Sequence, residues 1–205
     1  MITIIDYGVG NLFSLVSSLS VIGAEARVAS DPEEIRKGDR IILPGVGAFG
    51  DAAERLSAAG LDKVIKDEAA RGKPLLGICL GMQLLFDKSY EYGCHEGLGL
   101  ISGEVRPITE VIPKEAKVPH IGWNSLDFTG DYKNCPLFKY LHDGDYVYFV
   151  HSYYAAKCEP SVIATADYGA PLTAAVMNAN VFGTQFHPEK SGDVGLSILK
   201  AFAEL

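Results

Sequence analysis

The segment PLLGICLGMQLLF, residues 74–86, holds a cysteine between two glycines at the end of an apolar run. The run before Cys79 is short and apolar throughout, which predicts a buried strand. The leucines after Cys79 recur at helical spacing, so a helix is expected to begin at once. A cysteine that is only a small buried hydrophobe needs no such position. The position of Cys79 therefore indicates a reactive thiol.

The five residues Gly77-Ile78-Cys79-Leu80-Gly81 fit the G-x-nucleophile-x-G pattern of a nucleophile elbow. Such a strand-to-helix turn crowds the backbone, so the positions two residues either side of the nucleophile need minimal side chains. At a helix N-terminus, unpaired N–H groups favour a thiolate, and the N–H of Leu80 would point at a developing oxyanion. The pattern also occurs by chance, but the strand before it and the helix after it favour a catalytic cysteine.

Outside this segment, strands and helices alternate through the first half of the chain. The runs MITIIDYG, AEARVAS and RIILPG predict strands, and helices are expected after Asn11, after Asp31-Pro32 and in two stretches between residues 48 and 72. Strands that are apolar throughout and alternate with helices indicate a parallel sheet covered on both faces. The fold class expected is α/β, with a central, mostly parallel sheet flanked by helices.

The second half predicts an additional antiparallel portion within one domain spanning residues 1–205. Turns separate its expected strands, and SGDVGLSILKAFAEL predicts a closing helix. The expected strands are GEVRPI, VPHIGWNSLDF, DYVYFVHSYYA, SVIATADYG, LTAAVMN and VFGTQFHPE.

Composition excludes several classes of protein. The 205 residues carry a formal charge of -8 with no cluster of Lys and Arg, which argues against a nucleic-acid partner. No apolar run reaches the roughly 20 residues that a membrane helix needs, and the N-terminus lacks the pattern of a signal peptide, so a cytoplasmic protein is expected. The four cysteines contain no C-x-x-C pair, so neither a metal site nor a redox pair is expected. Structural, buried roles are expected for Cys94, Cys135 and Cys158.

A catalytic thiolate needs a base, and His187 in GTQFHPEKS is the best candidate among five histidines. Pro188 holds His187 extended, and residues two apart in an extended chain point the same way. Glu189 can therefore orient the imidazole as the third member of a triad. His151 in YFVHSYY is the competing base; it lacks an adjacent acid, and a partly buried strand histidine is the alternative reading.

The segment LPGVGAFG supplies a glycine-rich loop between a strand and a helix. Because Gly45 and Gly47 carry no Cβ, this backbone can approach a substrate and donate a second hydrogen bond to an oxyanion. No G-K-[ST] follows, so it is not a phosphate loop, and DYGVGN lacks the third glycine of a dinucleotide fingerprint. No cofactor is expected.

With these motifs together, the sequence resembles the class I (triad) glutamine amidotransferases over essentially its whole length. LPGVGAFG, GICLGMQLLF and QFHPEKS mark this superfamily. Within it, DYGVGNL, PHIGWN and YFVHSYY resemble the glutaminase subunits of imidazole glycerol phosphate synthase, of histidine biosynthesis.

The resemblance implies roles for individual residues. Cys79 would attack the side-chain amide of L-glutamine, His187 would serve as acid and base, and Glu189 would orient His187. The oxyanion would be held by Leu80, Val46 and Gly47. Residues implied in substrate binding are Gly47, Gln83, Glu91, His151, Ser152 and Tyr153. For Glu91, a solvated loop carboxylate is an equal alternative.

The resemblance also implies a partner. The family passes ammonia to a (βα)8-barrel cyclase subunit in a heterodimer, which makes imidazole glycerol phosphate and an aminoimidazole carboxamide ribotide. Absence of a phosphate signature in this chain fits a ribotide that binds the partner. The expected interface comprises Asn11, His120, Trp123 and Asn124, with His120 beside Trp123 on an exposed surface. A core position is the alternative for Trp123, the only tryptophan.

Three other functions remain open at this point. The chain could be the glutaminase of another class I system, serving anthranilate, aminodeoxychorismate or pyridoxal phosphate synthesis. It could be a stand-alone cysteine hydrolase or chaperone of similar fold, although those tend to place histidine directly after the nucleophile, where this chain has Leu80. A non-catalytic binding module is the third, against which the complete Cys, His and Glu set argues.

Overall fold

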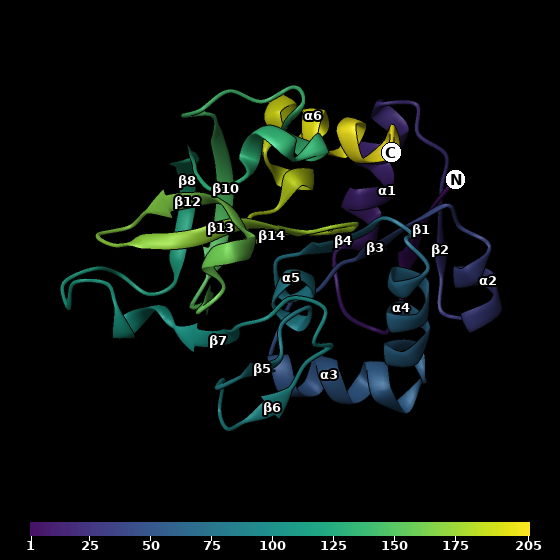
Figure 1. Ribbon diagram of the computed structural model, residues 1–205, viewed down its shortest axis with the longest axis horizontal. Helices are drawn as coiled ribbons and strands as arrows, with labels where there is room; N and C mark the ends of the chain where they lie inside the picture. Colours follow the sequence, from purple (N-terminus) through teal and green to yellow (C-terminus); the bar gives the residue numbers. More distant parts are fainter.

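An eight-stranded mixed sheet forms the centre of the computed structural model, which describes residues 1–205 (Figure 1). Its strand order is β2-β1-β3-β4-β14-β13-β12-β9. The parallel strands are β2 (Ala26–Ala29), β1 (Ile2–Ile5), β3 (Arg40–Leu43), β4 (Leu75–Ile78) and β14 (Val181–Thr184). The antiparallel strands are β13 (Pro171–Asn178), β12 (Val162–Asp167) and β9 (Asp127–Phe128). The expected α/β class, with a mostly parallel centre and an antiparallel extension, is confirmed.

Helices cover both faces of this sheet (Figure 1). One face packs against α1 (Leu12–Val21) and α6 (Gly192–Ala203), whose leucine, isoleucine and phenylalanine side chains join one hydrophobic cluster. The other face packs against a second cluster that includes α2 (Pro32–Arg36), α3 (Phe49–Ala58), α4 (Leu61–Ala70) and α5 (Leu80–Leu84). The central strands are buried on both sides, which is why their sequences are largely apolar. No helix is both long enough and apolar enough to span a membrane.

The helix starts follow the capping residues in the sequence. The Asn11 side chain accepts a hydrogen bond from Ser14 N at 3.4 Å, and Asp31 accepts from the backbone N–H groups of Glu33 and Glu34. Both side chains satisfy N–H groups that a helix start leaves unpaired. The expected helices at these positions are confirmed.

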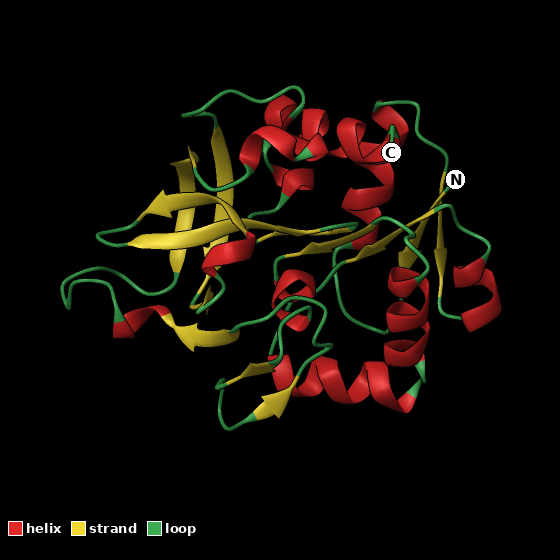
Figure 2. Cartoon of the chain, in the orientation of Figure 1, coloured by secondary structure: helices red, strands yellow, loops and turns green.

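Residues 88–156 build two smaller sheets beside the large one (Figure 2). One pairs β10 (Tyr146–His151) with β8 (His120–Ser125), and the other has the order β11 (Tyr153–Ala156), β7 (Glu104–Pro107), β5 (Lys88–Ser89), β6 (His95–Glu96). The run DYVYFVHSYYA, expected as one strand, therefore breaks at Ser152 and contributes to both sheets. This break faces the candidate site.

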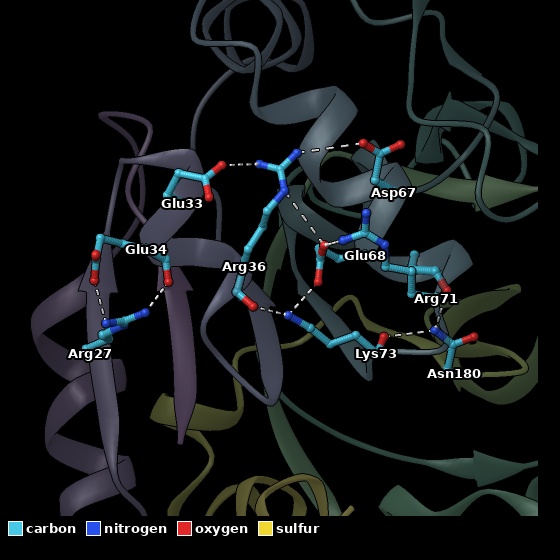
Figure 3. Close-up of polar contacts among 10 residues, drawn as sticks. Arg27, Glu33, Glu34, Arg36, Asp67, Glu68, Arg71, Lys73 and Asn180 are labelled. Carbon is cyan, nitrogen blue, oxygen red and sulfur yellow. Dashed lines mark hydrogen bonds and ion pairs between the residues drawn. The ribbon is translucent and has the colours of Figure 1, made fainter.

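A buried carboxylate joins α2, α4 and the chain entering β4 (Figure 3). Glu68 is 3% exposed and forms ion pairs with Arg36, Arg71 and Lys73. Asn180, just before β14, donates to the carbonyls of Ala69 and Lys73. Burial raises the pKa of Glu68, but the adjacent Lys73 and Arg71 outweigh it and hold the pKa below its usual range. These contacts anchor the strand that carries the cysteine.

Candidate active site

Cys79 lies at the turn between β4 and α5 with φ 55° and ψ -110°. A positive φ is uncommon for a residue with a side chain and marks a strained turn. A Cβ on Gly81 would lie 1.8 Å from the Leu43 carbonyl oxygen, and one on Gly77 would lie 2.6 Å from the Gly81 oxygen. Both flanking positions therefore require glycine. The predicted nucleophile-elbow geometry is confirmed.

His187 and Glu189 form a buried pair after β14. His187 Nδ1 lies 2.8 Å from Glu189 Oε1, and their side chains are 3% and 2% exposed. His187 has an extended backbone, whereas Glu189 lies in a 3-10 turn, Pro188–Lys190. The predicted pairing is present, but its predicted cause is wrong, because a turn rather than an extended segment brings the carboxylate to the ring.

The charge state of His187 is set by its two neighbours. Burial lowers its pKa, but Cys79 and Glu189 stabilise the imidazolium and raise the pKa to about 9. Nε2 of His187 has no hydrogen-bond partner, and His187 lines the same cavity as Cys79. An imidazolium with a free N–H beside a thiol is suited to stabilise a thiolate and then to protonate a leaving group.

A buried amide chain ends at the cysteine sulfur. Gln185 is fully buried, and its Nε2 lies 3.7 Å from Cys79 Sγ. Gln83 Nε2 donates to Gln185 Oε1 at 3.0 Å and to the Tyr153 carbonyl at 3.2 Å. Sequence reasoning missed Gln185, although its position two residues before His187 is a usable signal. An N–H donor at this sulfur favours the thiolate.

A cavity of about 340 Å³ brings most of the predicted site residues together. This volume suits a small molecule, since ligand pockets are roughly 300–1,000 Å³. Its lining comprises Val46, Gly47, Cys79, Leu80, Gln83, Glu91, Pro119, Val150, His151, Ser152, Tyr153 and His187. Glu189 lies behind His187 and does not line it. A larger cavity, about 630 Å³, contains none of these catalytic candidates.

Glu91 is half-buried at the edge of this cavity, so it is not a freely solvated loop residue. Its Oε2 accepts a hydrogen bond of 2.6 Å from the backbone N–H of Phe49, at the start of α3. Burial raises the pKa of Glu91, and the Phe49 N–H opposes that rise. A carboxylate held at a cavity wall is a suitable partner for a ligand ammonium.

The two loop glycines differ in their surroundings. A Cβ on Gly45 would lie 2.7 Å from the Tyr7 hydroxyl and 2.9 Å from Gly81 N, so Gly45 is required for packing. Gly47 has φ +98° and no atom within 4 Å of such a Cβ. The expectation that both glycines free the loop to approach a substrate is therefore wrong for Gly45. The conformational freedom lies at Gly47, which borders the cavity.

The expected interface residues occupy different environments. Trp123 is 56% exposed, which excludes a core position, and Asn11 and Asn124 are partly exposed. His120 is only 3% exposed, so its expected place on an exposed surface is wrong. The reason is strand alternation: the side chains of Ile121 and Trp123 point outward, while His120 packs between Phe149 and Tyr168.

The family model "Glutamine amidotransferase class-I" matches residues 3–204. The chain belongs to the class-I glutamine amidotransferase family. Proteins described as "Imidazole glycerol phosphate synthase subunit HisH" are 49% identical in Wolinella succinogenes and 50% identical in Caldanaerobacter subterraneus. These alignments cover 100% of this chain and 100% and 98% of the relatives, respectively.

Two solved structures share the fold. A crystal structure described as glutamine amidotransferase has a TM-score of 0.75 at 17% identity and covers 99% of both chains. A structure of PurLQS from Thermotoga maritima has a TM-score of 0.74 at 22% identity, covering 99% of this chain and 97% of that chain. At these identities the likeness concerns the class-I amidotransferase fold alone.

Proposed function

We propose that this chain is the glutaminase subunit of an imidazole glycerol phosphate synthase in histidine biosynthesis. It hydrolyses L-glutamine to glutamate and ammonia through a cysteine thioester. The observation that carries the proposal is one cavity that holds Cys79, His187 and Glu91 in a chain about half identical to named HisH subunits over its full length.

The first half-reaction releases ammonia. The Cys79 thiolate attacks the side-chain amide carbon of glutamine, and the carbonyl oxygen becomes an oxyanion. Backbone groups at the cavity wall stabilise the negative charge of this oxyanion: the N–H of Leu80 and the backbone at Val46 and Gly47. His187 then gives its Nε2 proton to the departing nitrogen as the carbon–nitrogen bond breaks, which leaves a glutamyl thioester and ammonia.

The second half-reaction restores the enzyme. Neutral His187 takes a proton from water, which attacks the thioester carbon, and the carbon–sulfur bond breaks to release glutamate and the thiolate. Glu189 holds the His187 ring through Nδ1 in both half-reactions.

Glutamine binding uses cavity-lining residues other than the catalytic ones. The Glu91 carboxylate receives the ammonium group of glutamine. Both Nε2 hydrogens of Gln83 are engaged with Gln185 and Tyr153, so its Oε1 is the atom left for the ligand. The backbone of His151, Ser152 and Tyr153 completes the wall.

Ammonia passes to a (βα)8-barrel cyclase that closes the imidazole ring. The docking surface is the outward side of β8, which bears Ile121 and Trp123, 59% and 56% exposed. Pro119, directly before β8, lines the catalytic cavity, so this surface adjoins the cavity mouth. Exposed aromatic residues are typical anchors of protein interfaces.

The test measures glutamate release by the purified chain alone, with the cyclase subunit, and with that subunit plus its ribotide. Activity that is strong only in the last mixture and lost in Cys79→Ala supports both the triad and the partner. Activity that ignores the cyclase would favour another class-I system, and no activity in any mixture would overturn the proposal. Low activity of the isolated chain is expected if the backbone at Gly47 turns its donor away, since one lost oxyanion donor costs roughly 10²- to 10³-fold.

A further inference from the structure

Two buried histidines that perform no step of this mechanism lie side by side next to the cavity. His120 on β8 and His151 on β10 face each other in the antiparallel pair and are 3% and 6% exposed. His120 Nδ1 lies 3.0 Å from His151 Nε2. Buried polar groups at this distance must share a proton in one direction, so their tautomers are linked.

The donor and the acceptor of this hydrogen bond follow from the groups that the two histidines contact on their other sides. His151 Nδ1 lies 2.8 Å from the Tyr153 carbonyl, which can only accept, so His151 carries its proton on Nδ1. His151 Nε2 is then an acceptor, and His120 must donate from Nδ1. His120 Nε2 is in turn an acceptor for the Asn124 side-chain amide, 3.4 Å away.

The Asn124 amide has a fixed orientation. Its Nδ2 also donates to the Asp167 carbonyl at 2.8 Å, and its Oδ1 accepts from Ser125 N at 2.9 Å. Asn124 therefore presents a donor to His120, and every hydrogen bond from Asn124 to Tyr153 points in one direction.

We propose that His120 and Asn124 are positioning residues of the glutaminase site: their hydrogen bonds hold His151 as the Nδ1–H tautomer, which fixes the Tyr153 carbonyl in the glutamine-binding wall. The inference rests on the proposed function. The Tyr153 carbonyl also accepts a hydrogen bond from Gln83 Nε2 at 3.2 Å. The series of hydrogen bonds from Asn124 to Tyr153 therefore also sets where Gln83 presents its Oε1.

The surroundings keep both histidines neutral. His120 is stacked between Phe149 and Tyr168, with ring centroids 4.7 Å and 4.1 Å away. Burial lowers the pKa of His120 to about 4 and that of His151 to about 3. A proton on His151 Nε2 would oppose the His120 Nδ1 proton and add a cation near His187. Because both histidines are neutral, every hydrogen bond from Asn124 to Tyr153 keeps the same donor-to-acceptor direction.

The test uses the full-length chain and reads the tautomers directly. Imidazole nitrogen NMR of histidine-labelled protein at pH 7 reports which ring nitrogen of each histidine is protonated, and single variants assign the signals. His120→Phe keeps a ring in the stack but removes the donor. His120→Asn returns an amide N–H near the position of Nδ1. His142→Phe, at a side chain 88% exposed, is the matched control.

We expect Nδ1–H signals from both histidines in the natural sequence and in the control. In His120→Phe, His151 should become a mixture of tautomers, and KM for glutamine in the cyclase complex should rise about tenfold, with a smaller change in kcat. His120→Asn should restore both readouts. If His120→Phe does not fold, Asn124→Leu serves instead, with the mixture then expected at His120.

The inference is overturned if His151 keeps its tautomer and KM is unchanged in His120→Phe, or if His120→Asn recovers neither. An Nε2–H tautomer of His151 in the natural sequence overturns it as well. Failure of the proposed function is distinguishable, because the unmodified chain would then release no glutamate while the tautomers remained readable.

Discussion

At the scale of single residues, one carboxylate sets the charge of the proposed acid-base group. Glu189 is buried beside His187, and with Cys79 it raises the pKa of His187 to about 9. Replacing Glu189 by Gln removes the negative charge and keeps the shape. We expect the pKa of His187 in Glu189→Gln to fall clearly below 9, as measured by NMR titration of the imidazole.

The raised pKa of His187 also makes the stability of the protein depend on pH. A histidine whose pKa is raised on folding adds stability that is fully present below the unfolded pKa of about 6.5 and is lost as pH rises through the folded value. Unfolding free energies should therefore decline between about pH 6.5 and 9 in the natural sequence, and less steeply in Glu189→Gln. Equal slopes, together with an unchanged His187 titration, would contradict the assigned role of Glu189.

Other residue environments depend on contacts that a sequence does not display. Cys79 and His187 could be selected from local patterns, because an elbow and an H-P-E segment have recognisable spacing. Gln185 and His120 could not be placed as readily. Their environments are set by β14 lying beside β4 and by β8 pairing with β10, which join segments far apart in the chain.

At the scale of elements, β1, β3 and β4 were predictable because each is largely apolar and is followed by a helix. The strand in VFGTQFHPE was expected in the antiparallel portion, and that expectation is wrong, because β14 pairs in parallel with β4. The division of the antiparallel half into separate sheets was not predictable, since the partner of each strand depends on long-range pairing. The break at Ser152 illustrates this: a run expected as one strand enters two sheets and leaves its backbone facing the cavity.

The Glu68 network gives a prediction at this scale. Lys73→Met removes one of the cations that compensate a buried carboxylate, so the folded state should lose about 1–2 kcal/mol at pH 7. The low pKa of Glu68 means that its stabilisation is present at neutral pH and is lost as pH falls through that pKa. Chemical denaturation should show the difference between variant and natural sequence shrinking below about pH 4.

A control for this substitution lies on α4, the helix that carries Glu68. Lys66 in α4 is exposed, so Lys66→Met changes charge and composition equally without touching Glu68. It should cost less than about 0.5 kcal/mol. Two results would argue against a role for the buried ion pair. One is a loss of unfolding free energy in Lys66→Met as large as that in Lys73→Met, and the other is a loss in Lys73→Met that does not depend on pH.

At the scale of the whole molecule, the site occupies the carboxyl ends of three neighbouring parallel strands. The loop holding Gly47 follows β3, Cys79 follows β4 and His187 follows β14. Ligands bind at this edge in open α/β sheets, because loops from adjacent strands converge there. The two small sheets close the cavity from the other side through residues 151–153.

This arrangement leaves the outward side of β8 as the surface for the proposed cyclase, and Trp123 as its anchor. Trp123→Ala should weaken the complex by about 30-fold or more in Kd, since interface tryptophans commonly contribute 2 kcal/mol or more. Calorimetric titration with the cyclase subunit measures this loss, and the unfolding free energy of the isolated chain should change little, because the side chain is 56% exposed. Val21→Ala is the matched control, since Val21 is 72% exposed in the last turn of α1, toward the opposite edge of the sheet. Equal affinities of both variants for the cyclase would exclude β8 as the docking surface while leaving the assignment of the triad intact.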